Sequence, residues 1–412
     1  MSGRLLTGNG AAAWAARLAH VDYVPAFPIT PQTEIIETIS RWTDSGEMPA
    51  RMVTLESEHS MLTAAGAAAA TGVRVFTATS SQGLLYAMEM IYAVTGWRVP
   101  FVLVNVSRGI ASPVTLESDH NDIMAARDSG FLQLHCSTCQ EVLDSILLAY
   151  RLAEHQRVRL PAIVNLDGFY LSFTREAVDL PDADTVRRFL KPYDPENIKF
   201  RASQPVSQAV AVLGGSQYSY FRYEIHLAAL NAIEVYREIA AEFADLFGRS
   251  YEAVETYRTE DANIVFLMLG SFATKGKDAV DRLRDGGANV GLVRPRLLRP
   301  FPEDEIRRAV AGKQAVIVID QNLSMGKGGV VHAETASVLY GRPDAPGVLL
   351  SFIGGLGGRD ISAEEFYEMV AIAEQAIASG DTPPPRLLFT EDELREIRKL
   401  QAVAQVEREE LR

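Results

Sequence analysis

The chain has 412 residues, more than one ordinary hydrophobic core contains, so we expect two or three domains. Hydrophobic residues make up 47% of it and charged residues 23%, which is typical of soluble globular proteins. The net charge of −13 argues against binding to nucleic acid or an anionic membrane, and no apolar run approaches the roughly 20 residues of a membrane span.

The first 175 residues alternate between strand-like and helix-like segments. Gly8, Gly10 and Arg17 interrupt the Ala-rich opening, which indicates a strand end, a turn and a helix rather than a signal peptide, so we expect a cytoplasmic protein. Short apolar strands are expected at 73–80, 99–107, 131–135 and 160–167, with helical periodicity between them. This order predicts a doubly wound α/β domain with a parallel sheet over 1–175.

The pattern changes after residue 175. Prolines punctuate 176–261, which we predict as a connecting region with a long helix at 221–247. A second α/β unit is expected over 262–380, with strands at 263–271, 290–296, 315–320 and 348–355 and helices at 275–285 and 303–310. The last segment, 381–412, contains a charged amphipathic helix that we expect to pack on its own fold or on a partner.

The two cysteines, Cys136 and Cys139, form a single CxxC motif. A redox dithiol and half of a zinc site are both possible interpretations, but a structural zinc needs four ligands and only His135 and His155 lie nearby. We therefore favour two small residues at a strand-to-helix turn. Two cysteines are too few for an iron–sulfur cluster, which typically takes about four thiolates.

Four stretches of the first domain carry polar residues beside expected strand ends. They are AFPITPQTE (26–34), TLESEHSMLTAAGAAAATG (54–72), TATSSQGL (77–84) and the segment from Val104 through Arg108 to Gly130. Ligands of open parallel sheets collect at the carboxyl ends of strands, where Arg108 is expected. Taken singly these signals are weak, because an Arg after a strand is commonly solvated and an acid before a helix simply favours its N-terminus.

Two glycine clusters, MGKGG (325–329) and GGLGGRD (354–360), fit neither of the common phosphate-loop patterns. We interpret them as turns beside a subunit or ligand interface.

Together and in this order, the four stretches resemble the alpha subunit of the 2-oxoacid:ferredoxin oxidoreductases, the family of pyruvate synthase. The second half adds YFRYE, YEAVETYRTEDA, RPFPEDEI and GGLGGRD, so the resemblance spans nearly the whole chain. It implies that 1–175 is the pyrimidine-binding domain of a thiamine-diphosphate enzyme and that 262–380 is a second α/β domain like the C-terminal domain of transketolase. No GDG motif followed by paired asparagines occurs, so the diphosphate is expected on another chain.

The resemblance also implies roles for individual residues. Glu58 matches the glutamate that activates the cofactor, with Glu56 as its competitor. Arg108 matches the arginine that binds the substrate carboxylate, and Thr30 matches a hydroxyl that hydrogen-bonds the substrate. The remaining matches are Ser81 and Gln82, expected at the cofactor, and Asp119, His120 and Asp122, expected in the pocket or behind it. His120 is equally well a structural histidine, and no metal ligand is expected in this chain.

The implied enzyme works only with partner subunits. It shares thiamine diphosphate with a beta subunit that carries the diphosphate-binding module. The resemblance implies that Mg²⁺ and 4Fe–4S clusters lie on partners, which include gamma and ferredoxin-like iron–sulfur subunits, and that ferredoxin or another acceptor takes the electrons. It oxidatively decarboxylates a 2-oxoacid to an acyl-CoA and CO₂, with coenzyme A as co-substrate.

The substrate is less well defined than the reaction. The FPITP loop contains no Lys or Arg, which favours a monocarboxylate and pyruvate first, and leaves branched-chain 2-oxoacids and phenylglyoxylate open. A self-contained transketolase-type transferase is a second hypothesis, opposed by the missing diphosphate motif. A non-catalytic paralogue that binds a partner is a third, opposed by the presence of Glu58, Thr30 and Arg108.

Overall fold

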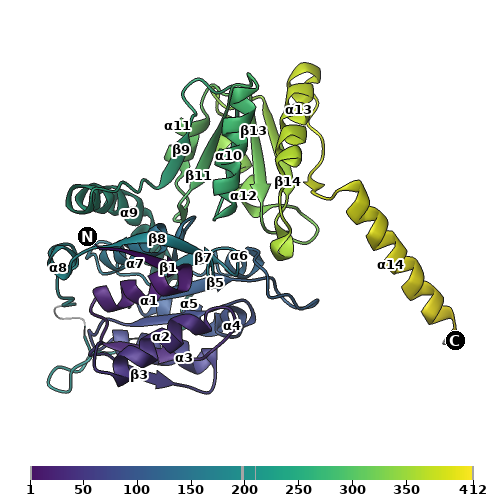
Figure 1. Ribbon diagram of the computed structural model, residues 1–412. Coiled ribbons are helices and arrows are strands. Elements are labelled where there is room, and N and C mark those ends of the chain that lie inside the picture. Colours follow the sequence, from purple (N-terminus) through teal and green to yellow (C-terminus); the bar gives the residue numbers. More distant parts are fainter. Residues whose placement is uncertain (1, 196–198, 209, 411–412) are drawn as a thin grey trace.

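The computed structural model describes residues 2–195, 199–208 and 210–410. Two α/β units follow each other along the chain and lie against each other (Figure 1). Each contains a largely parallel sheet with helices packed on it, so the predicted α/β fold class is confirmed. The boundaries at residues 175, 261 and 380 stay predictions.

The sheet of the first unit has five strands in the order β12–β6–β7–β5–β4. Its strands are β4 (Phe76–Thr79), β5 (Val102–Ser107), β6 (Leu132–His135), β7 (Ala162–Asp167) and β12 (Leu297–Arg299). The first four run parallel, and β12 pairs antiparallel with β6. The carboxyl ends of β4, β5, β6 and β7 therefore share one edge. A parallel pair, β2 (Tyr23–Ala26) and β3 (Arg51–Thr54), lies beside β4.

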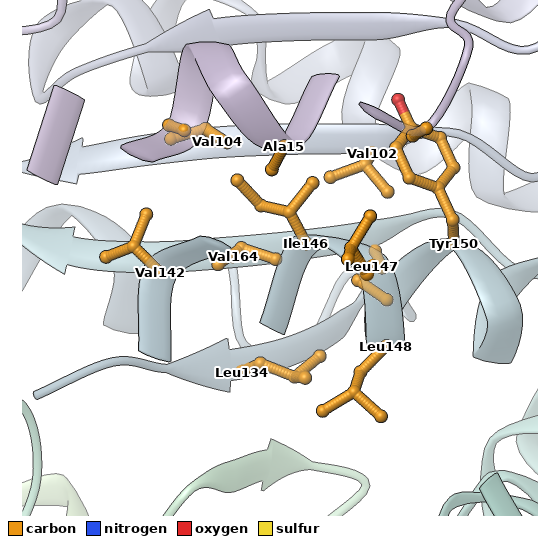
Figure 2. Close-up of a cluster of buried hydrophobic side chains, with 14 of the residues drawn as sticks. Ala15, Val102, Val104, Leu134, Val142, Ile146, Leu147, Leu148, Tyr150 and Val164 are labelled. Carbon is orange, nitrogen blue, oxygen red and sulfur yellow. The ribbon is translucent and has the colours of Figure 1, made fainter. Parts of the chain in front are cut away.

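Helices connect these strands and cover the sheet. They are α1 (Gly8–Leu18), α2 (Thr33–Asp44), α3 (Glu58–Ala69), α4 (Gln82–Tyr86), α5 (Met88–Gly96), α6 (Asn121–Ala125) and α7 (Cys139–Ala153). Figure 2 shows α7 packing its apolar side chains between the sheet and α1. The contacting residues drawn there include Ile146 and Leu147 of α7, Ala15 of α1, Val104 of β5 and Val164 of β7.

The segment after residue 175, predicted as a connecting region, adds to the core of the first unit. Strand β8 (Arg175–Leu180) pairs antiparallel with β1 (Ser2–Thr7) along its whole length. Helix α8 (Ala183–Phe189) is followed by the long helix α9 (Gly215–Phe247), which packs on α7 and α8. The ring of Phe189 meets those of Phe243 and Phe247 with centroids 5.3 and 5.6 Å apart.

The second unit contains a six-stranded sheet in the order β15–β14–β13–β10–β11–β9. Its strands are β9 (Val254–Tyr257), β10 (Ile264–Met268), β11 (Val290–Pro295), β13 (Ala315–Asp320), β14 (Val348–Ile353) and β15 (Arg386–Leu387). Its helical elements are α10 (Phe272–Asp285), α11 (Glu303–Val310), α12 (Val330–Leu339), the 3-10 turn η1 (Leu356–Gly358) and α13 (Ala363–Ser379). After β11 the chain crosses to the other side of β10 to form β13, so the topological switch point lies between β10 and β13.

Buried charges join the two units. Arg294 in β11 and Arg296 after it both donate to the Glu141 carboxylate in α7, the former over 2.8 Å. Burial alone would raise the pKa of Glu141, but the two guanidinium groups hold it well below its usual range. Arg294 also donates to Glu255 of β9 over 2.6 Å, and strand β12 then enters the first sheet.

The final helix, α14 (Glu391–Glu410), is held at its base and projects away from the body (Figure 1). Arg359 pairs there with Glu393 over 2.7 Å and with Glu365 over 2.8 Å. Farther along, Leu400 and Val403 are 69% and 57% exposed. Within the described ranges, no helix has both the length and the apolar character needed to cross a membrane.

Candidate active site

The polar residues singled out in the first unit gather where β4 and β5 end and where α3 begins. Ser81 and Gln82 follow β4, Arg108 follows β5, and Glu58 is the first residue of α3. Each of these apolar strands ends where hydroxyl, amide or charged residues begin in the sequence. The parallel register then brings them to one edge of the sheet.

Glu58 has a buried carboxyl at a helix N-terminus. Ser57 caps α3 by accepting a hydrogen bond from the Ser60 amide over 3.2 Å. Glu58 is only 5% exposed, and over the described residues its carboxylate accepts no hydrogen bond from another side chain. Burial raises the pKa of Glu58, although a hydrogen bond from its own amide opposes the rise. A carboxyl of this kind holds a proton closer to neutral pH than an exposed one.

Glu56, the competitor, is exposed and accepts a hydrogen bond from the Ser60 hydroxyl. That bond lowers the pKa of Glu56. The pKa of Glu58 is thus raised and that of Glu56 lowered. A group that must hold a proton needs a raised pKa, which favours Glu58.

Gly83 leaves the space that the Glu58 carboxyl occupies. A β-carbon at Gly83 would lie 2.5 Å from Glu58 Oε1 and 2.5 Å from Thr79 Oγ1. The Thr79 hydroxyl is buried and has no hydrogen-bond partner among the described residues. Only glycine fits at this position without moving Glu58 or Thr79.

Arg108 is held by two neutral acceptors and keeps one buried donor free. Its Nη1 donates to the Thr30 carbonyl and its Nη2 to Gln82 Oε1, both over 2.6 Å. Its Nε–H is buried and has no acceptor in the described part of the chain. Arg108 is 8% exposed, and burial lowers its pKa, although the charge of Asp122 opposes this shift. A carboxylate is the acceptor that such a site would bind most strongly.

The loop that contains Thr30 is fixed from both sides. Gln32 Nε2 donates to the Phe27 carbonyl and Asn9 Nδ2 to the Pro31 carbonyl, each over 2.9 Å. The Thr30 side chain is exposed, while its carbonyl holds Arg108.

Asp119, His120 and Asp122, the three candidates at the start of α6, have different surroundings. Asp122 is wholly buried behind Ser81 and Arg108. Asp119 lies beside Gly109 and accepts from the amides of Asn121 and Gly357, over 3.0 and 3.4 Å. The glycine cluster around Gly357 therefore lies at an interface between the two units of this chain.

The His120 ring lies against Asp167 and His135 of the first unit and near Gly270 of the second. Its Nε2 lies 2.7 Å from Asp167 Oδ1, and its ring packs edge-on against His135 at 5.5 Å. Its contacts thus match the structural-histidine alternative rather than a side chain of the Glu58–Arg108 cluster.

Sequence patterns did not indicate the contact between Asp167 and Ser271. Asp167 ends β7 and Ser271 precedes α10, and the Ser271 amide donates to Asp167 Oδ2 over 2.7 Å. Burial would raise the pKa of Asp167, but the charge of His120 and hydrogen bonds from His120 and Ser271 lower it to about 2. The sequence shows a polar residue at the end of β7 and another after β10, but it contains no signal that these two residues are in contact.

Cys136 and Cys139 are both buried free thiols. Thr138 caps α7 by accepting from the Glu141 amide over 3.1 Å, in agreement with the strand-to-helix turn that we favoured. Burial raises the pKa of Cys139 to about 12. In the described ranges, no cluster of three or more His, Cys, Asp or Glu side chains could hold a metal ion.

The chain is similar to known proteins over most of its length. Residues 14–243 match the family described as pyruvate flavodoxin/ferredoxin oxidoreductase, thiamine-diphosphate-binding, and 262–366 match pyruvate:ferredoxin oxidoreductase core domain II. A pyruvate synthase subunit, PorA, of Pyrococcus abyssi is 39% identical over 92% of this chain and 96% of its own length. A ketoisovalerate oxidoreductase subunit, VorA, of Pyrococcus horikoshii is 38% identical over 92% of this chain and 95% of its own.

A solved 2-oxoglutarate:ferredoxin oxidoreductase from Magnetococcus marinus, with 2-oxoglutarate, coenzyme A and succinyl-CoA bound, has the same fold, with a TM-score of 0.68 at 19% identity. The alignment covers 90% of this chain and 65% of that one.

The fold and the matched domain define the class: the chain is part of an oxidoreductase and carries a thiamine-diphosphate-binding domain. More particularly, it belongs to the pyruvate flavodoxin/ferredoxin oxidoreductase family. The predicted family and enzyme class are thereby confirmed.

Proposed function

We propose that this chain is the alpha subunit of a multi-subunit enzyme that oxidatively decarboxylates a monocarboxylic 2-oxoacid, with pyruvate favoured, to an acyl-CoA and CO₂. One observation carries the proposal. A buried, unpartnered carboxyl, Glu58, and a buried arginine with a free Nε donor, Arg108, lie on either side of the same Ser81–Gly83 turn. The first suits a cofactor nitrogen and the second suits a substrate carboxylate.

The residues fit the pyrimidine half of thiamine diphosphate. When bound, this cofactor supplies the carbon nucleophile and electron sink that decarboxylation of a 2-oxoacid needs. Glu58 would hold a proton at the pyrimidine nitrogen N1′, and burial raises the pKa of its carboxyl, which is the direction that this role needs. Ser81 and Gln82 belong to the turn whose Gly83 lies against the Glu58 carboxyl.

Arg108 binds the substrate carboxylate through its free Nε donor and the adjacent edge of its guanidinium. Because Thr30 and Gln82 hold the other side, the guanidinium is already oriented. The exposed Thr30 hydroxyl is available to the same substrate. The residues around Arg108 supply no second cation, and this supports a monocarboxylate as substrate. They are Thr30, Ser81, Gln82 and Asp122.

Partner subunits complete the enzyme in this proposal. A beta subunit provides the diphosphate-binding module and Mg²⁺, since the sequence lacks the GDG motif. Gamma and ferredoxin-like subunits provide 4Fe–4S clusters, since this chain has only two cysteines, and ferredoxin or another acceptor receives the electrons. Coenzyme A accepts the acyl group.

A second substrate is favoured by a specific observation. The ketoisovalerate oxidoreductase subunit is 38% identical to this chain, nearly as similar as the pyruvate synthase subunit at 39%. A branched-chain 2-oxoacid is therefore the alternative to pyruvate.

The test is to purify the native complex anaerobically through a tag on this chain and to measure reduction of a viologen dye. Pyruvate, 2-oxoisovalerate, phenylglyoxylate, 2-oxoglutarate and oxalate are compared, with and without coenzyme A. We expect coenzyme A-dependent reduction, fastest with pyruvate. Intact partners and no reduction with any of the five acids would refute the proposal.

A further inference from the structure

Asp122 lies in the first turn of α6, is wholly buried, and accepts hydrogen bonds from two neighbouring strand ends. Its Oδ2 accepts from the backbone amides of Ser81 and Arg108, over 3.0 and 3.3 Å. The same oxygen accepts from Asn105 Nδ2 over 3.1 Å, and Oδ1 accepts from the Ser107 hydroxyl over 2.7 Å. One carboxylate thus joins the end of β4 to the end of β5 through main-chain groups.

The turn that Asp122 holds is one that the chain does not adopt freely. Ser81 has φ +46°, a region that side-chain-bearing residues rarely occupy and that persists only where the surroundings enforce it. Two contacts of Ser81 enforce it: its amide donates to Asp122, and its hydroxyl donates to the Gly109 carbonyl over 2.8 Å.

Both halves of the site depend on this turn. Gly83, two residues on, lies against the Glu58 carboxyl, and Gln82 between them accepts from Arg108 Nη2. The backbone amide of Arg108 donates to Asp122, so Asp122 also holds the main chain that carries the Arg108 side chain. A shift of the turn relative to the end of β5 would therefore change the distance between Glu58 and Arg108.

We propose that Asp122 is a positioning residue that sets the spacing between Glu58 and Arg108 by holding the Ser81 and Arg108 amides on one carboxylate oxygen. The inference rests on the proposed function of those two residues. It concerns the backbone, since Asp122 reaches neither side chain directly.

The test uses the assembled complex with Asp122→Ala or Asp122→Asn, and with Asp144→Ala as a matched control. Asp144 is also wholly buried and accepts from Arg249 and Tyr251, but it lies on α7, away from both strand ends. Hydrogen exchange measured by mass spectrometry reports the Ser81 and Arg108 amides. The viologen assay gives KM for the 2-oxoacid and kcat separately, and thermal melts record the stability of each variant.

For Asp122→Ala we expect exchange at both amides to quicken about tenfold or more, because buried donors lose their acceptor. We expect KM to rise and kcat to fall, each about tenfold, as Arg108 and Glu58 move apart. Asp122→Asn should keep exchange at the Ser81 and Arg108 amides within about threefold of wild type, because its amide oxygen can face the three N–H donors of Oδ2. Its NH₂ group then donates to the Ser107 hydroxyl, and the Ile123 amide, which donates to Oδ1 over 2.6 Å in the wild type, loses its acceptor. Asp144→Ala lowers the melting temperature and leaves KM and kcat within about twofold.

Unchanged exchange or unchanged KM in Asp122→Ala would overturn the inference, as would an Asp144→Ala variant with the same rise in KM. Should Asp122→Ala not assemble, Ser107→Ala replaces it, with about threefold faster exchange at both amides expected and no change counting against the inference. The exchange measurement does not need turnover. If the wild-type complex uses no 2-oxoacid while exchange still quickens, the holding of the two strand ends stands and the proposed function falls.

Discussion

Replacing Arg108 by alanine tests the substrate-binding half of the site. The guanidinium is 8% exposed, two of its nitrogens are held by neutral acceptors, and its Nε donor is free. A carboxylate bound there would form a charge-assisted contact away from bulk water. Truncating one partner of such a pair costs about 2–4 kcal/mol, or a loss of about 30- to 900-fold in kcat/KM.

The assay is dye reduction by the assembled complex over a range of 2-oxoacid concentrations. Much of the loss should appear as a raised KM, because Arg108 binds the substrate carboxylate before that group leaves as CO₂. Arg98→Ala is the control, since Arg98 also donates to two carbonyls, those of Val158 and Arg159, at the opposite edge of the sheet. An unchanged dependence on 2-oxoacid concentration in Arg108→Ala would remove Arg108 from the site.

Other changes have equally definite outcomes. Glu58→Gln should lower turnover by about 10²- to 10⁴-fold while gel filtration shows an intact complex, and normal turnover would move the role to Glu56. Gly83→Ala should lower kcat at least about tenfold, because its β-carbon would displace the Glu58 carboxyl; unchanged kcat would show that Glu58 tolerates displacement. The pKa of Asp167, lowered to about 2 from 3.8, gives stability that is present above pH 3.8 and is lost as the pH falls through 2. Melting temperatures of Asp167→Asn should therefore depend less on pH across that interval than those of the wild type.

Local patterns predicted most of the elements, because buried parallel strands are short apolar runs. The strand expected at 315–320 is β13, and the helix expected at 303–310 is α11. Helix α9 begins at Gly215 rather than at residue 221. Its first residues, Gly and Ser, are weak helix formers, but extending an existing long helix costs less than starting one.

Long-range contacts had no signal in the sequence. Strand β8 lies in a stretch that we predict as irregular, and its partner β1 is at the other end of the first unit. Glu141 and Arg294 are likewise far apart in the chain, and no local sequence pattern relates one to the other. Among the site candidates, residue type alone did not separate Asp122, which accepts from the Arg108 amide, from His120, which contacts Asp167.

The contact between Asp167 and Ser271 has a consequence for the second unit. In doubly wound sheets, the gap between strands that leave in opposite directions is where an anionic ligand usually binds, beside a helix N-terminus. Here β10 and β13 flank that gap, and the carboxylate of Asp167 reaches the Ser271 amide at the start of α10. The chain thus supplies its own anion at a position where related architectures bind a diffusible one, and the N-terminus of α10 holds the first unit against the second.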